Sequence, residues 1–192
     1  MEYAATSQLM TGIAGNVAVD IRNFEAILRL YKPKVFRFLL ASLREKDIAE
    51  TLTQDCFFKA YQARERFREE CSIETWLMQI AVNLVRDYSR NRRLQFWRRT
   101  QLAAKPVENL QDWFSDNRHS PEATALLKEK IQEVWSAADT LPERQRTVFL
   151  LRFVEDMDLL EIAAVTGMKE GTVKTHLFRA LQSVRERTGV EK

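Results

Sequence analysis

Apolar residues recur with the spacing of an α-helix along most of the chain from residue 20 onward. The first such stretch holds Phe24, Ile27, Leu28 and Tyr31, which follow the i, i+3, i+4, i+7 pattern of one helix face. Proline is tolerated in the first turn of a helix, so Pro33 predicts that a second helix restarts there. Its apolar stripe comprises Val35, Phe38, Leu39 and Leu43. The pattern therefore predicts two consecutive helices before residue 44.

Two further helices are predicted before residue 97. One runs from about Asp47 to Arg64. A short polar loop, residues 68–72, precedes the other, which continues into a basic segment near Arg90. The apolar positions expected to be buried on it are Trp76, Leu77, Ile80, Ala81 and Leu84. These helices complete a first predicted domain.

The helical pattern fails over residues 98–122, which are rich in Pro, Asn, Asp and Ser. Beyond them a stripe resumes at Leu127, Ile131, Val134, Trp135 and Ala138. Pro142 is expected in the first turn of the next helix, and two short helices follow. With only five glycines and four prolines in 192 residues, long helices are favoured over a β-rich fold.

We therefore predict an all-α protein of two small helical domains joined by a flexible linker, the second domain containing a helix-turn-helix. The predicted boundaries are a disordered N-terminal arm at 1–19, a first domain at 20–97, a linker at 98–122 and a second domain at 123–192.

The helix-turn-helix prediction rests on residues 158–187. Asp158 followed by Glu161 has the form of a capping box that opens a helix. Gly167 suits the left-handed turn that ends this helix. A small residue, Ala163, is expected at the helix crossing, with the β-branched Val173 beneath the second helix.

The outer face of that second helix is polar and basic. It offers Lys169, Thr172, Lys174, Thr175, His176 and Arg179, together with one acid, Glu170. A recognition helix reads bases from its N-terminal residues, and Lys and Arg also bind phosphates. An ordinary helical hairpin with a solvated face would show similar spacing. The preceding helices and the basic face favour DNA binding.

The end of the first domain is also basic. Arginines occur at 86, 90, 92, 93, 98 and 99 against a single acid, Asp87, with the aromatic residues Tyr88, Phe96 and Trp97 between them. Cations bind phosphate and aromatic faces stack on unpaired bases. The alternative is a solvated helix end whose cations complement the helix dipole. The density of arginine favours nucleic-acid contact.

Other functional classes receive no support from the sequence. Cys56 and Cys71 form no disulfide framework and, with two isolated histidines, no zinc-site spacing, so neither a metal nor a cofactor is expected. Glycine-rich phosphate loops and catalytic groupings are absent from the sequence, so we expect no enzyme. We also expect no signal peptide and no membrane insertion. The net charge of +3 points only weakly to nucleic acid.

Four segments in order resemble the extracytoplasmic-function (ECF) sigma factors. Residues 49–57 resemble their polymerase-binding helix, and Phe67-Arg68, Ser72 and Thr75-Trp76-Leu77 resemble their promoter-melting segment. Ile80-Ala81, Asn83, Asp87 and Arg90 resemble the helix that reads the −10 element. Leu141-Pro142, Arg152-Phe153, Glu161-Ile162-Ala163 and residues 171–174 resemble the domain that reads the −35 element. Three positions depart from the family: Thr51 replaces a frequent acid, Glu69 the usual glycine and Glu74 a frequent basic residue.

The resemblance implies a sigma factor that binds core RNA polymerase and directs promoter-specific initiation of transcription. It implies polymerase docking by Leu52, Gln54, Asp55 and Phe57. It implies contacts with the −10 strand by Ser72, Trp76, Asn83, Arg86, Arg90 and Arg93. It places the −35 contacts on the outer face of residues 169–179 described above. It further implies a bacterial cytoplasmic protein, monomeric when free, in a stress or envelope response under an anti-sigma factor.

Two other functions remain to be compared with this one. A stand-alone regulator would bind duplex DNA without polymerase, normally as a symmetric dimer. A protein-interaction adaptor would bind no DNA at all. For the sigma factor, we also expect the two basic domains to fold back on each other or on the acidic part of the linker, in a loose closed form that low salt favours.

Overall fold

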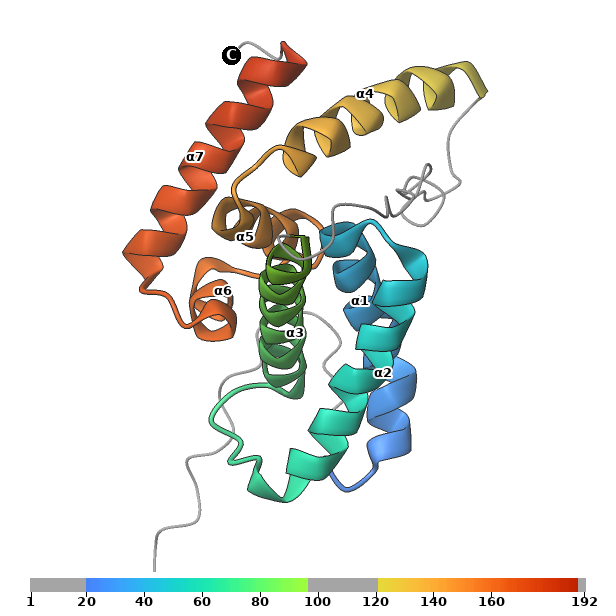
Figure 1. Cartoon of the computed structure of the whole chain (residues 1–192), viewed down its shortest axis with the longest axis vertical. Helices are drawn as coiled ribbons and strands as arrows, with labels where there is room; N and C mark the ends of the chain where they lie inside the picture. The colour runs from blue at the N-terminus through green and yellow to red at the C-terminus, as the bar shows by residue number, and fades with distance from the viewer. Residues whose placement is uncertain (1–19, 97–120, 190–192) are drawn as a thin grey trace, which may run out of the picture.

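The computed structural model describes residues 20–96 and 121–189. Within these ranges the chain forms seven α-helices and one short 3-10 helix, and no strand. The elements in order are α1 (Phe24–Leu43), α2 (Lys46–Ala63), η1 (Arg64–Arg66), α3 (Ile73–Phe96), α4 (Pro121–Asp139), α5 (Glu143–Phe153), α6 (Leu159–Thr166) and α7 (Glu170–Thr188) (Figure 1). The all-α prediction is confirmed. The predicted arm at 1–19 and nearly all of the predicted linker at 98–122 lie outside the described residues.

The first domain is built on three helices, α1, α2 and α3. Its buried residues include Ile27, Phe38 and Leu39 from α1, Cys56 from α2 and Leu77 from α3. Asn23 opens α1, where its side chain accepts a hydrogen bond from the Ala26 amide at 3.1 Å. At the other end Arg44 takes a left-handed conformation with φ of 62°.

The predicted break at Pro33 is wrong, because α1 runs as one helix from Phe24 to Leu43. A proline inside a helix removes one hydrogen bond and crowds the preceding turn. Here Tyr31 and Val35, on either side of the proline, are both buried in the same core. Packing of both halves against α2 and α3 therefore keeps them on one axis.

The second domain consists of α4 to α7. Its core takes Trp135 and Ala138 from α4, Val148 and Leu151 from α5, and Ile162 from α6. The first helix begins at Pro121, slightly before the predicted boundary at 123. Proline suits a first helical position, where its missing amide hydrogen would have no partner in any case. Pro142 is the N-cap of α5 rather than a residue of its first turn.

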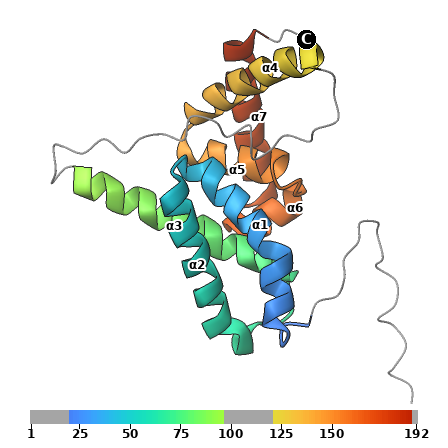
Figure 2. The same ribbon diagram turned by 90° about the vertical axis from the view of Figure 1, so that its right-hand side faces the viewer.

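The two domains pack directly against each other, α1 against α5 and α3 against α6, as the two orthogonal views show (Figures 1 and 2). Arg37 of α1 binds Glu155, which follows α5, through two hydrogen bonds of 3.0 and 2.7 Å. The Glu155 side chain is 0% exposed. The arrangement is thus closed, as expected, but it contains a buried ion pair, whereas the prediction was a loose association of exposed surfaces.

Candidate promoter- and polymerase-binding surfaces

The helix-turn-helix of the second domain has the local geometry that its sequence predicts. The Asp158 carboxylate accepts a hydrogen bond from the Glu161 amide, and the Glu161 carboxylate accepts one from the Asp158 amide, each at 2.8 Å. Gly167 ends α6 with φ of 69°. Val173 is fully buried on the inner side of α7, and Ala163 of α6 is half-buried. The capping box, the glycine turn and the buried β-branched residue are all confirmed.

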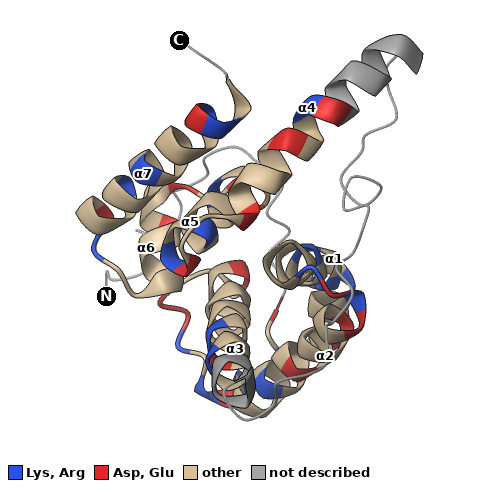
Figure 3. Ribbon diagram, turned by 45° about the horizontal axis from the view of Figure 1, so that its top comes forward, with Lys and Arg blue, Asp and Glu red and all other residues tan. Residues whose placement is uncertain are grey.

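The outer face of α7 and its N-cap carries most of the predicted −35 residues at the surface. Lys169, Thr172, Lys174, Thr175 and Arg179 are exposed. Lys and Arg positions are coloured blue along the ribbons of both α7 and α3 in Figure 3. Lys174 pairs with Glu170 one turn earlier at 2.6 Å, and the Thr175 hydroxyl donates to the Gly171 carbonyl at 2.9 Å. The face is therefore open to solvent in this conformation.

Two residues of α7, His176 and Phe178, differ from the others of this face in burial or in character. His176 is half-buried, and its Nδ1 atom is buried without a hydrogen-bond partner among the described residues. Phe178 is 68% exposed, beside Arg179 and one turn after Lys174. The only sequence signal for Phe178 is that it falls off the inner stripe of the helix. Its exposed aromatic ring therefore adds an apolar group to the polar face that is predicted to read DNA.

The loop before α3 is held by its own side chains. The Ser72 hydroxyl accepts a hydrogen bond from the Thr75 amide at 3.0 Å and lies 2.8 Å from the Thr75 hydroxyl. Ser72 therefore acts as the N-cap of α3. Trp76 is half-buried, with its ring centroid 5.0 Å from that of Phe67. Glu69 takes φ of 56°, a left-handed conformation that favours glycine.

The outer side of α3 presents the predicted −10 residues Asn83, Arg86 and Arg90, all exposed. Arg86 donates a hydrogen bond to the Asn83 side chain at 3.3 Å, and Arg90 pairs with Asp87 at 3.1 Å. Arg93 belongs to α3, but its side chain lies outside the described residues.

Glu74, in the first turn of α3, is bound within the first domain. Its carboxylate accepts a hydrogen bond from Lys34 of α1 at 2.9 Å. The acid at this position is therefore neutralised by a cation from another helix of the same domain.

The predicted polymerase-binding residues of α2 divide between its two sides. Gln54 and Asp55 are exposed and Leu52 is half-buried. Phe57 is only 4% exposed, with its ring against Phe24 at 6.3 Å between centroids, so it does not join the others at the surface. The next residue, Phe58, is 61% exposed. Sequence reasoning overlooked Phe58, because consecutive phenylalanines give no indication of which ring is buried.

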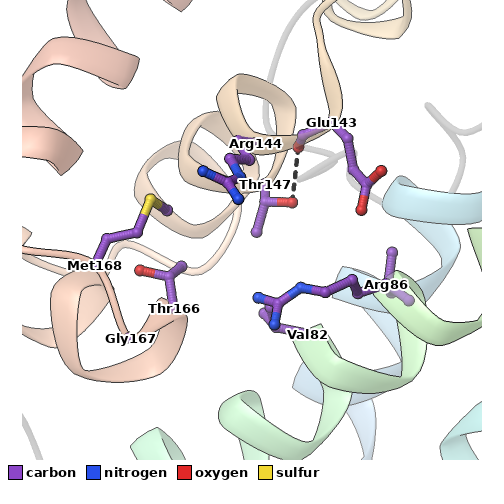
Figure 4. Close-up of a pocket in the computed structure, with 9 residues that line it drawn as sticks. Val82, Arg86, Glu143, Arg144, Thr147, Thr166, Gly167 and Met168 are labelled. Atoms are coloured by element: carbon purple, nitrogen blue, oxygen red, sulfur yellow. Dashed lines mark hydrogen bonds between the residues drawn. The ribbon is translucent and has the colours of Figure 1, made fainter. Parts of the chain in front are cut away.

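A cavity of 310 Å³ lies between the two domains beside the helix-turn-helix (Figure 4). Val82, Val85 and Arg86 of α3 form one side, while Arg144 of α5 and the Thr166–Met168 turn form the other. The turn between α6 and α7 thus faces the helix predicted to read the −10 element.

Comparison with known proteins gives matches in both domains. The models "Sigma-70 region 2" and "Sigma-70, region 4" match residues 27–95 and 131–184. ECF RNA polymerase sigma factor SigW of Bacillus subtilis is 26% identical over 163 residues, 85% of this chain and 87% of its own. ECF RNA polymerase sigma-E factor of Escherichia coli K12 is 30% identical over 168 residues, 86% of each chain. This chain belongs to the ECF sigma factors.

The fold agrees with solved sigma-factor structures. The sigma factor RpoE of Bartonella quintana, in a complex with the anti-sigma factor NepR, superposes with a TM-score of 0.68 at 22% identity, over 89% of this chain and 99% of that one. CnrH, in a complex with the cytosolic domain of CnrY, superposes with a TM-score of 0.61 at 18% identity, over 90% and 92% of the two chains.

As a sigma factor, the protein binds core RNA polymerase and directs promoter-specific initiation; it is an initiation factor and not an enzyme. In the described part of the chain, no cluster of three or more His, Cys, Asp or Glu residues is placed to hold a metal ion. Within the same ranges, none of the helices combines the length and apolar character needed to cross a bilayer.

Cys56 shows how a reactive residue type is kept inert here. Its thiol is buried and donates to the Leu77 carbonyl at 3.6 Å. Burial raises the pKa of this thiol to about 12. The residue therefore contributes to packing between α2 and α3.

Proposed function

We propose that the second domain, predicted at 123–192 and beginning structurally at Pro121, reads the −35 element with the outer face of α7. The observation that carries this proposal is the exposed basic face of α7, the second helix of the helix-turn-helix. The first helix, α6, opens with a capping box and ends at a left-handed glycine, and α7 buries Val173 on its inner side. The residues assigned are Lys169, Thr172, Lys174, Thr175, His176 and Arg179. Phe178 is added because its exposed ring lies among them, where it can contact thymine methyl groups.

The first domain, predicted at 20–97, is proposed to read and melt the −10 element. Exposed Asn83, Arg86 and Arg90 follow one side of α3, and Ser72 stands at its start. Arg93 and Trp76 complete the set that the family resemblance implies. Trp76 is assigned a supporting role, because its ring packs on Phe67.

Polymerase docking is proposed on the outer side of α2. Gln54 and Asp55 supply exposed polar groups and Phe58 an exposed aromatic ring, while Leu52 is partly accessible. Phe57 supports this surface from the core. Aromatic residues surrounded by polar groups are typical anchors of protein interfaces.

Regulation by an anti-sigma factor, in a stress or envelope response in the bacterial cytoplasm, is the proposed context. The RpoE structure that this chain resembles was determined with the anti-sigma factor NepR, which supports such a partner. We expect the free protein to be a monomer. Its two DNA-reading domains differ from each other and bind different promoter elements, so the DNA need not contain two symmetric half-sites.

The experiment is transcription in vitro with core polymerase, followed by mapping of start sites. We expect defined starts that require both the protein and core enzyme. Duplex-operator binding by the protein alone, without any effect on start sites, would instead indicate a stand-alone regulator. Failure to bind DNA with or without core enzyme would indicate an adaptor.

A further inference from the structure

At the interface between the two domains, buried charges and free helix-end carbonyls are bound by side chains from the opposite domain. Arg37 reaches Glu155, whose carboxylate is 0% exposed, whereas the Arg37 side chain retains 34% exposure. Burial raises the pKa of the Glu155 carboxyl above its usual range, even with the Arg37 guanidinium against it. The negative charge at this position therefore depends on Arg37 for its stability.

Each domain also caps a helix end in the other. The Ala41 carbonyl, in the last turn of α1, accepts a hydrogen bond from Arg146 of α5 at 2.8 Å. The Ala164 carbonyl, near the end of α6, accepts one from Gln79 of α3 at 2.9 Å. The last four carbonyls of a helix have no partner within it, so these contacts stabilise both helices.

A second ion-pair cluster lies at the same end of α1. Asp139, the last residue of α4, is bound by Arg44 at 2.6 Å and by Arg146 at 2.8 Å. Arg146 thus joins the α1 carbonyl to the α4 carboxylate. The buried ion pair, the two helix-end hydrogen bonds and the Asp139 cluster together indicate a specific interface between the domains.

Promoter reading requires the domains to separate. Elements about two turns of DNA apart are separated by ~70 Å. In the structure the turn before α7 faces Val82 and Arg86 of α3 across a cavity, and α6 packs on α3. The reading surfaces are individually exposed in this arrangement, but they lie too close together to occupy both elements at once.

We propose that the Arg37–Glu155 pair is the latch of a closed resting state, and that core polymerase opens this state after docking on α2. The docking side of α2, with Gln54, Asp55 and Phe58, is exposed in the closed form, so polymerase can bind before the domains part. This inference rests on the proposed division of promoter reading between the two domains.

If this pair is the latch, replacing Arg37 and replacing Glu155 should change the ratio of open to closed molecules by different amounts. R37Q leaves the fully buried Glu155 carboxylate without its cation, which is strongly unfavourable unless the domains part. E155Q leaves Arg37, which already reaches solvent, with a neutral hydrogen-bond acceptor. We expect R37Q to raise the ratio of open to closed molecules by at least ~10-fold and E155Q to raise it less. The double variant R37Q/E155Q removes the buried charge and is expected to be more closed than R37Q.

The measurement is energy transfer between dyes on the free full-length chain. K46C and S136C place labels on exposed sites of α2 and α4, close to the Arg44–Asp139 contact and outside the proposed docking segment. C71S removes the more accessible native thiol, and Cys56 stays unlabelled because it is buried with a raised pKa. R29Q is the matched control, because Arg29 lies on the same helix and pairs with Glu25 at the surface, within its own domain.

We expect high transfer in the parent and in R29Q, lower transfer in R37Q, and partial recovery in R37Q/E155Q. Equal transfer in R37Q and the parent, or no recovery in the double variant, overturns the latch. If circular dichroism shows that R37Q has lost helix, the swap R37E/E155R decides: parent-like transfer supports the latch and loss of transfer overturns it.

Adding core polymerase to the labelled parent tests the opening step. We expect transfer to fall when polymerase binds, and unchanged transfer in the bound complex overturns the proposed opening. Start-site mapping on the same samples keeps the sigma function separate. Defined promoter starts without any latch effect would leave the proposed function intact and remove only the latch.

Discussion

The two regions that are proposed to read the promoter each contain a residue in the left-handed backbone conformation, but the residue type differs. The turn of the helix-turn-helix places Gly167 in the left-handed region at φ of 69°, whereas the loop before α3 places Glu69 there at φ of 56°. Glycine adopts this conformation without steric cost, and glutamate does not. The turn of the second domain follows local rules, whereas the loop of the first domain is maintained by its surroundings.

The helices that follow these turns differ in the same way. One side of α7 is buried within its own domain and the other is exposed. By contrast, α3 packs against α1 and α2 and also against α6 of the second domain. A reading helix that depends only on its own domain can act independently, whereas α3 is coupled to the position of the second domain.

The largest expected effect is a loss of stability on mutation of the first-domain core beneath the proposed docking surface of α2. F57A removes a buried ring beside Phe24 and should lower the free energy of unfolding by about 3–5 kcal/mol. F58A, at the exposed neighbouring position, should leave stability nearly unchanged and weaken core polymerase binding. Denaturant unfolding and a direct binding assay separate the two. Equal stability losses in both variants would contradict the assignment of one ring to the core and the other to the surface.

A change on the recognition helix tests whether α7 reads DNA by itself. K174A/R179A should reduce promoter-specific transcription, since each base-reading contact is worth about 1–3 kcal/mol. A phosphate contact would instead weaken all sequences alike and reduce the salt dependence. The control R185A/R187A removes two exposed cations from the far end of the same helix. Normal transcription from every cognate promoter by K174A/R179A would rule out this reading face.

Charge reversal on α2 probes the surface that the closed form leaves free. D55K should weaken core binding by about tenfold, because an exposed acid at an interface is replaced by a repelling cation. Helicity and melting temperature should not change, since Asp55 is exposed. E65K, a reversal at an exposed site just beyond α2, is the control. Binding of D55K as tight as that of E65K would exclude Asp55 from the docking surface.

The smallest effect concerns the contrast between the two turns. E69G should raise the free energy of unfolding by about 0.5–1 kcal/mol, because glycine relieves the left-handed strain although it adds disorder to the unfolded chain. E70G, at the next exposed position, where the backbone has no positive φ, should lower stability by a few tenths of a kcal/mol, as only the entropic cost remains. Thermal melts of the two variants compare them directly, and a loss of stability in E69G would show that the loop gains from Glu69.

Much of the fold and of the second-domain site could be predicted from local patterns. The capping box at Asp158 and Glu161, the glycine turn and the stripe through Val173 are all short-range features. The misplaced residues are those whose burial depends on other elements. Pro33 lies inside a helix because the core holds both flanks, and Phe57 rather than Phe58 faces Phe24. His176 is half-buried although the polar face of its helix predicted exposure.

The sequence by itself determined the helical regions apart from the false break at Pro33, the helix-turn-helix, the basic faces of α3 and α7, and the family of this protein. These features depend on hydrogen bonds and apolar periodicity over a few residues, so they can be recognised directly in the sequence. The tertiary structure alone decided that Arg37 meets Glu155, that Arg146 and Gln79 cap helices of the opposite domain, and that α3 is packed on two sides. From its neighbours in the sequence, Glu155 would be predicted to be an ordinary surface acid. It is buried only because Arg37, 118 positions away in the sequence, supplies the compensating charge.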